Sequence, residues 1–175
     1  MTVERERHPY IMANLIQKHN IKIFAEIGVK NSMMFESIMR DIGAEIKEYW
    51  AIDRWEGTRK DNQWVWDRRH KLCCTLMTHY SALRVLRMHA VQAASVIKDG
   101  YFDAVFLDTS HEYARTKREV LAWIPKIKNG GLFTGHDLAL PQKQYHGGVK
   151  KALDEIWTDY EVVDDGVVGF FIKRL

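Results

Sequence analysis

The segment Phe102–Leu107 constrains the fold of this chain more than any other. It is an almost unbroken apolar run, with Asp103 as the exception. Side chains of a strand alternate between its two faces, so this run predicts a strand covered on both faces, as in a parallel sheet between helices. The run ends at Asp108, and His111 follows three residues later. Open α/β sheets bind ligands at the carboxyl ends of their strands, so both side chains are candidates for a functional site.

A second segment repeats this pattern further along the chain. The residues from Gly131 onward are mostly apolar until His136 and Asp137. If the two segments form neighbouring parallel strands, they bring ionisable groups to one rim of the sheet. This pair of strand ends is the best functional indication in the sequence.

Strand-like and helix-like segments alternate along the chain, which predicts a parallel sheet with helical crossovers. The expected helices are residues 9–18, 32–42, 61–80, 91–97, 113–128 and 149–156. The expected strands are 21–29, 49–52, 83–88, 102–108, one opened by Gly130-Gly131, and two closing strands at 160–163 and 167–172. Asp164-Asp165-Gly166 would join the last two as a hairpin that adds an antiparallel strand. The predicted fold class is α/β: a doubly wound, Rossmann-like three-layer sandwich with a mostly parallel seven-stranded sheet.

The length and composition are those of a single globular domain. No repeat or linker interrupts the 175 residues, so we expect one domain over residues 1–175, with residues 1–20 forming a covering helix. The 26 basic and 23 acidic residues are too balanced to favour a nucleic-acid partner, and the basic cluster 68–71 is interpreted as a solvated helix face. The tryptophans Trp123 and Trp157 are assigned to the core, and one of Trp64 and Trp66 to a pocket or a subunit contact.

Compartment and membrane partners can also be predicted. The adjacent Cys73 and Cys74 would make a poor disulfide and suit a reducing compartment. No apolar run approaches the roughly 20 residues that cross a bilayer, and residues 1–7 are charged without an apolar segment behind them, unlike a secretory signal. We therefore expect a cytoplasmic protein without a membrane partner.

The first predicted strand ends in a turn that suits a nucleoside ligand. Gly28 lets the backbone approach a ligand closely, and Asn31 tolerates a left-handed conformation. Asp53 lies 25 residues later, near the spacing of the acid that bonds ribose hydroxyls in nucleotide-binding α/β proteins. The plain alternative is an ordinary strand-to-helix turn and a strand-end Asp. Together the two features favour a nucleoside.

Four motifs in the same order and at similar spacing resemble class I S-adenosylmethionine-dependent methyltransferases, closest to their metal-dependent O-methyltransferase branch, which includes catechol and macrolide-sugar O-methyltransferases. The motifs are Ala25-Glu-Ile-Gly28, Trp50-Ala-Ile-Asp53-Arg-Trp55, Phe102-Asp-Ala-Val-Phe-Leu-Asp108-Thr-Ser-His111 and Asn129-Gly-Gly-Leu-Phe-Thr-Gly-His136-Asp137. The resemblance runs from about Ile21 to the C-terminus and implies one class I methyltransferase domain.

The resemblance implies a set of cofactor residues. Glu26 and the turn from Gly28 through Asn31 to Ser32 would hold the methionine end of S-adenosylmethionine, and Asp53 would bond the ribose. The remaining expected cofactor contacts are Trp55, His89 and Ala90 near the adenine, and Asp108. The turn departs from the family at residues 30–32, where glycine-richer sequences are usual.

The strand ends carry the expected chemistry. A divalent cation could lower the pKa of an acceptor hydroxyl, and Asp108 and Asp137 are candidate ligands for it. The resemblance places metal ligands at Asp108, His136 and Asp137 and the general base at His111, whose ordinary pKa of about 6.5 suits that role. Mg²⁺ is favoured, but His136 stands where a carboxylate is expected, which leaves Mn²⁺, Fe²⁺ or Zn²⁺ open. His136 could instead bond the substrate, and His111 could be an ordinary helix N-terminal residue.

The resemblance implies metal-assisted O-methylation of a small hydroxylated acceptor, either a sugar or a phenol. The alternative is a degenerate relative that binds the cofactor or a protein partner without turnover. Neither hypothesis requires a nucleic-acid or membrane partner. A homo-oligomer in which a partner completes the substrate pocket is a further possibility. The loop from Leu138 to Gly148 follows Asp137 directly and could cover the site.

Overall fold

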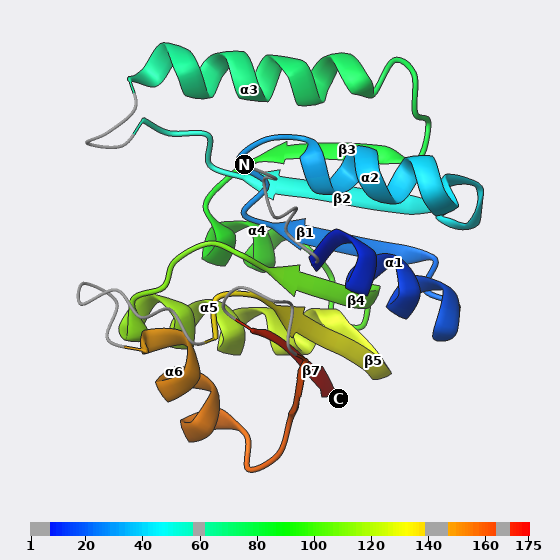
Figure 1. Ribbon diagram of the computed structural model, residues 1–175. Helices are drawn as coiled ribbons and strands as arrows, with labels where there is room; N and C mark the ends of the chain where they lie inside the picture. The colour runs from blue at the N-terminus through cyan, green and yellow to red at the C-terminus, as the bar shows by residue number, and fades with distance from the viewer. Residues whose placement is uncertain (1–7, 58–61, 139–146, 164–168) are drawn as a thin grey trace, which may run out of the picture.

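The computed structural model describes residues 8–57, 62–138, 147–163 and 169–175 (Figure 1). The helices are α1 His8–Lys18, α2 Met33–Ile42, α3 Gln63–Leu76, α4 Ala90–Val96, α5 Tyr113–Trp123 and α6 Gly148–Ile156, with short 3-10 turns at Gly43–Glu45 and Ile124–Lys126. The strands are β1 Ile23–Ile27, β2 Glu48–Asp53, β3 Leu83–Arg87, β4 Phe102–Leu107, β5 Ile127–Gly135, β6 Glu161–Val163 and β7 Phe170–Arg174. None of these helices has the length and apolar character needed to cross a bilayer.

The strands form one seven-stranded sheet in the order β3-β2-β1-β4-β5-β7-β6. The pairs from β3 to β5 are parallel, and β7 runs antiparallel to both β5 and β6. This confirms the predicted α/β sandwich and its antiparallel C-terminal strand. The order reverses between β1 and β4, and such a reversal opens a crevice at the carboxyl ends of the strands, where α/β proteins bind ligands.

The sheet separates two apolar cores, as the continuous apolar strands require. Helices α1, α2 and α3 cover one face, where Phe24 and Phe106 point, and α4, α5 and α6 cover the other, where Ala25 and Val105 point (Figure 1). Because neighbouring residues of β1 and β4 face opposite cores, both strands are buried on both sides. Their ends are thereby held in fixed positions at the rim of the sheet.

The predicted helix over residues 113–128 is too long. Helix α5 ends at Trp123, a 3-10 turn that contains Pro125 follows, and β5 already begins at Ile127. Proline cannot donate the backbone bond that a continuing helix needs, and the carbonyls of Pro125 and Lys126 accept bonds from Gly100 and Tyr101 at the start of the neighbouring strand. The predicted hairpin turn at 164–166 lies outside the described residues.

Within α5, Trp123 should contribute more to the stability of the fold than the exposed Leu121. Its side chain is 0% exposed and its indole N–H donates to the Ala90 carbonyl at 3.1 Å, which ties α5 to α4. We expect Trp123→Ala to lower the free energy of unfolding by about 3–5 kcal/mol through cavity formation. Leu121→Ala in the same helix, at a side chain 51% exposed, should cost less than about 1 kcal/mol. Urea unfolding of both variants measures the difference, and equal losses would contradict this assignment.

Candidate functional site

The carboxyl ends of β1, β2, β4 and β5 surround a cavity of about 800 Å³, within the range of small-molecule sites. All but two of the predicted site residues line it: Glu26, Gly28, Asn31, Asp53, His89, Ala90, Asp108, His111, His136 and Asp137. Both halves of the predicted site, the nucleoside half and the ionisable strand ends, therefore lie in one cavity.

Gly28 lines the cavity at the point where the end of β1 approaches the end of β4. Its φ of +96° is a left-handed conformation that side chains rarely adopt, and a Cβ added there would overlap the backbone carbonyl of Asp108. Its N–H donates to the Ile52 carbonyl at 2.8 Å, while the Asp108 N–H donates to Ile27 at 2.8 Å. Backbone hydrogen bonds thus join the ends of β1, β2 and β4 around position 28, which only glycine can occupy.

The Asp53 carboxylate is fixed by two backbone N–H groups. Lys30 donates to its Oδ2 and Trp55 to its Oδ1, both at 2.8 Å. Both donors have positive φ, +55° for Lys30 and +43° for Trp55, a conformation that costs about 1 kcal/mol or more in non-glycine residues. Strained turns on two different strand ends therefore orient one carboxylate.

Trp55 and Ser32 are the two predicted residues that do not line the cavity. The Trp55 side chain is 0% exposed and packs against the imidazole of His70 at 4.9 Å between ring centroids. Its expected place near the adenine stays a prediction, but the indole has no exposed face to offer. Ser32 is buried and donates its hydroxyl to Glu36. Trp66 of α3 lines the cavity, while Trp64 is 64% exposed.

Glu26 is a buried carboxyl group at the cavity wall. Burial raises its pKa well above the ordinary range, and the charges of Asp108 and Asp53 add to this. The Tyr49 hydroxyl donates to Glu26 Oε2 at 2.6 Å and partly offsets the effect. A cationic ligand group beside Glu26 would favour its ionised form.

Asp108, His111 and Asp137 form a compact polar cluster, with donor atoms within 4.8 Å of one another. His111 Nε2 lies 2.7 Å from Asp137 Oδ2 and 3.8 Å from Asp108 Oδ1. Burial alone would lower the His111 pKa, but the two carboxylates outweigh it and raise the pKa to about 9. Burial acts against the charge of Asp137 as well, yet the imidazoles of His111 and His136 hold its pKa well below the usual range.

His136 stands apart from this compact cluster. Its Nδ1 lies 3.5 Å from Asp137 Oδ1, and its buried ring lies 4.7 Å from the ring of His8. The structure therefore groups His111, rather than His136, with the two carboxylates as a possible metal-binding set. The predicted ligand role of His136 stays a prediction. Asp137 has a φ of +60°, a strained conformation often found at functional sites.

Several cavity residues were missed by the sequence analysis, among them His8 from α1 and Glu119 from α5. The Glu119 carboxylate accepts a bond from the Thr109 hydroxyl, and burial raises its pKa. His8 stacks on Phe106, at 5.8 Å between ring centroids. No local pattern marks either residue, because helices that are distant in the sequence bring them to the strand ends.

Comparison with known families identifies the domain. A family described as "Methyltransferase domain" matches residues 25–138, which run from within β1 to just past the end of β5 and include both halves of the predicted site. The chain belongs to this methyltransferase family. A search of curated proteins found no match to the sequence.

Solved structures share the fold at low sequence identity. A proposed caffeoyl-CoA O-methyltransferase from Staphylococcus aureus is 17% identical, with a TM-score of 0.68 over 99% of this chain and 85% of that one. An O-methyltransferase from Bacillus cereus in complex with SAH is 13% identical, with a TM-score of 0.66 over 99% and 82%. Spermidine synthase from Thermotoga maritima is 10% identical, with a TM-score of 0.69 over 97% of this chain and 60% of that one. At these identities the likeness shows the methyltransferase-type fold.

The raised His111 pKa predicts a pH-dependent stability. The folded protein binds this proton more tightly than the unfolded chain, so the contribution is complete below pH 6.5 and is lost as the pH rises through about 9. In EDTA, we expect the stability difference between wild type and His111→Asn to shrink between pH 6.5 and pH 10 by on the order of 2 kcal/mol.

Urea unfolding at several pH values measures this difference. The buried Glu26 carboxyl group also makes stability depend on pH, but its contribution cancels because both proteins carry it. His79→Asn, at an exposed histidine after α3, is the control for replacing a histidine outside the cavity. A difference that is constant across this range would show that the carboxylates do not hold a proton on His111.

Proposed function

We propose that this protein transfers the methyl group of S-adenosylmethionine to a hydroxyl oxygen of a small acceptor, a sugar or a phenol, with assistance from a divalent cation. One observation carries the proposal. The fixed Asp53 carboxylate and the Asp108–His111–Asp137 cluster line the same cavity. A ribose anchor and an acid–base cluster in one cavity are what a cofactor-dependent transfer to oxygen requires.

The charges of the cavity suit this cofactor. Its acidic lining residues are Glu26, Asp53, Asp108, Glu112, Glu119 and Asp137, against Lys30, Arg54 and Arg115 as the lysine and arginine residues. The sulfonium and the amino group of S-adenosylmethionine are both cationic, so they are attracted to ionised carboxylates and would favour the ionised forms of Glu26 and Glu119, whose pKa values burial raises. Glu26 and the Gly28–Asn31 turn would receive the methionine end, Asp53 the ribose, and His89 and Ala90 the adenine side.

His111 is the proposed general base, because its imidazole lies at the end of β4 beside Asp108 and Asp137. A base that is protonated at pH 7 must first lose its proton, and the two carboxylates now retain it. The two carboxylates of Asp108 and Asp137 suit a divalent cation, which would leave the His111 imidazole free to act as base. When bound, such a cation would lower the pKa of the acceptor hydroxyl and neutralise the carboxylates that hold the His111 proton.

A degenerate, non-catalytic relative is the second candidate. Two observations favour it: the raised pKa of His111 and His136 at a position where the family resemblance leads us to expect a carboxylate. Such a protein would bind the cofactor or a protein partner without turnover. Methyl transfer to any acceptor decides between the two candidates.

We also propose a cytoplasmic location, without nucleic acid or membrane as partner. Both cysteines are free thiols, and burial raises the pKa of the Cys73 thiol to about 12, so it is inert at neutral pH. Free, unpaired cysteines suit a reducing compartment.

Asp53 should control cofactor affinity. We expect S-adenosylhomocysteine to bind in the micromolar range, about −8 kcal/mol, and Asp53→Ala to weaken binding roughly 100-fold because the ribose acceptor and both strained turns are lost. Asp53→Asn, which keeps one acceptor oxygen without the charge, should fall in between. Isothermal calorimetry measures the affinities. Asp99→Ala, at an exposed acid paired with Lys126, serves as control, and equal binding by Asp53→Ala would remove the ribose assignment.

His111 and the cation should make separable contributions to turnover. With Mg²⁺ or Mn²⁺ present, we expect His111→Ala to lower kcat by about 10²–10⁴-fold, the usual effect of removing a general base. Its affinity for S-adenosylhomocysteine should stay near that of the wild type. EDTA should abolish wild-type activity, and added cation should restore it in wild type but not in Asp108→Ala or Asp137→Ala.

A panel of phenols and sugars with labelled S-adenosylmethionine measures both effects. Full activity in excess EDTA would exclude the cation, and a loss below tenfold in His111→Ala would exclude this histidine as the base. Cofactor binding with no transfer to any member of the panel would favour the degenerate relative.

A further inference from the structure

The segment that follows Asp53 is held in a strained conformation without regular secondary structure. Trp55 is a bulky residue at φ +43°, yet its N–H supplies one of the two bonds that orient the Asp53 carboxylate. A strained bulky residue persists only where its surroundings determine its conformation. The buried indole provides part of this restraint, and the backbone carbonyl of Trp55 provides the rest.

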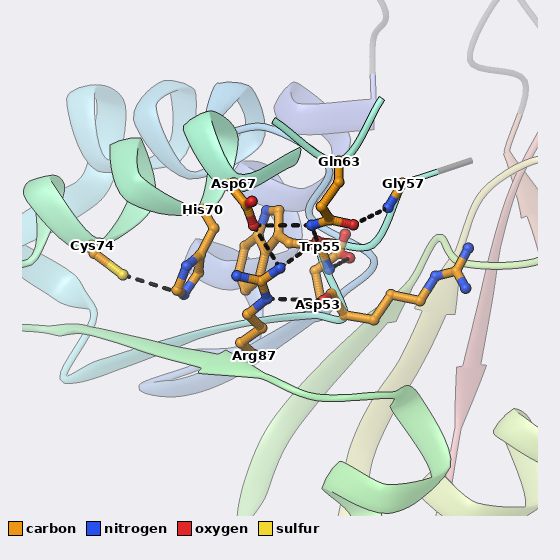
Figure 2. A network of polar contacts seen from close by, with 9 residues as sticks. Asp53, Trp55, Gly57, Gln63, Asp67, His70, Cys74 and Arg87 are labelled. Atoms are coloured by element: carbon orange, nitrogen blue, oxygen red, sulfur yellow. Dashed lines mark hydrogen bonds and ion pairs between the residues drawn. The ribbon is translucent and has the colours of Figure 1, made fainter. Parts of the chain in front are cut away.

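The carbonyl of Trp55 is held by Arg87, the last residue of β3 (Figure 2). Arg87 Nη2 donates to the Trp55 carbonyl at 2.8 Å and to Asp67 Oδ1 at 2.8 Å, and its Nε lies 3.3 Å from the Arg54 carbonyl. One guanidinium group therefore links three acceptors from two separate segments. A planar group with five donors can do this, whereas the ammonium of lysine cannot reproduce the fork.

Gln63, the first residue of α3, adds further contacts between this helix and the loop that follows Asp53. Gln63 donates to the Trp55 carbonyl at 3.1 Å and to Asp67 at 2.9 Å, and its side-chain oxygen accepts from the Gly57 N–H at 2.8 Å (Figure 2). Within α3, Cys73 is the one buried residue, and Trp66 and Leu76 are partly buried against the same core, so polar contacts add to a small apolar interface. The polar contacts of Arg87, Gln63 and Asp67, which we term the β3–α3 latch, join the helix to the loop after Asp53.

We propose that Arg87 is a positioning residue for the cofactor: through the β3–α3 latch it maintains the strained Trp55 backbone that orients the ribose-binding carboxylate of Asp53. This inference rests on the proposed function, because it assumes that Asp53 binds the ribose. Arg87 does not line the cavity formed by the described residues, so its effect on the cofactor is indirect. An exposed Arg–Asp ion pair alone would contribute little, but here the guanidinium also satisfies two backbone carbonyls of a strained segment.

Calorimetry with S-adenosylhomocysteine tests the latch directly. We expect Arg87→Ala to weaken binding about tenfold and Arg87→Lys about threefold, because lysine keeps the charge but not the fork. Asp67→Ala should have a smaller effect than Arg87→Ala, because Arg87 would still hold the two carbonyls. The matched control is Arg84→Ala in the same strand, whose guanidinium bonds the carbonyls of Ser81 and Leu83 outside the latch; its binding should equal that of wild type.

Two further measurements distinguish positioning from general destabilisation. Hydrogen exchange of the Trp55 and Lys30 amides should accelerate in Arg87→Ala, while exchange in β5 should not. In turnover, KM for S-adenosylmethionine should rise while kcat at saturating cofactor and KM for the acceptor stay constant. If wild type binds S-adenosylhomocysteine and Arg87→Ala binds it equally well, the latch is overturned while the proposed function stands. If wild type itself does not bind S-adenosylhomocysteine, the latch and the proposed function are both overturned. If Arg87→Ala loses overall stability and kcat together, Arg87 has a structural role only.

Discussion

The contact between Gly28 and the backbone of Asp108 is the constraint on which the rest of the site depends. No side chain fits at position 28, since a Cβ would overlap the Asp108 carbonyl. This close approach brings the ends of β1, β2 and β4 together. There the Gly28 N–H donates to the Ile52 carbonyl, and the Asp108 N–H donates to the Ile27 carbonyl. The turn that suits a nucleoside and the strand end that carries the ionisable cluster are therefore parts of one cavity rather than two separate sites.

The protein holds its cavity carboxylates in two different ways. Asp53 accepts bonds from the backbone N–H groups of Lys30 and Trp55, which are fixed in position and cannot be titrated. Asp108 and Asp137 instead share the side chain of His111, which can lose its proton or rotate away. The first arrangement suits a ribose-binding carboxylate whose position and charge stay constant, and the second suits a group that changes protonation state during turnover.

The sequence predicted the sheet and the residues at its rim because both depend on local pattern. An apolar run that ends in Asp108, or in His136 and Asp137, is visible without any tertiary information. Long-range packing decided the rest: His8 reaches the cavity from a helix more than 80 residues before β4. Trp55 lies beside Asp53 in sequence, yet its left-handed backbone turns the indole into the core. The early start of β5 depended on Pro125 and on backbone pairing with Tyr101.

The fold alone does not select the reaction, since an O-methyltransferase and a spermidine synthase share it with this chain. In the proposed function, the chemistry depends on the residues that follow β4 and β5, and among them on one atom, His111 Nε2. An imidazole nitrogen has a single lone pair, so Nε2 cannot coordinate a cation and accept a proton from the acceptor at the same time. Suppose that a cation binds Asp108 and Asp137 while His111 acts as base. Any further protein ligand of the cation must then be a residue other than His111, and His136, which precedes Asp137 in the sequence, is a candidate. If His136 is that ligand, the histidine that stands where the resemblance led us to expect a carboxylate would leave His111 free to act as base.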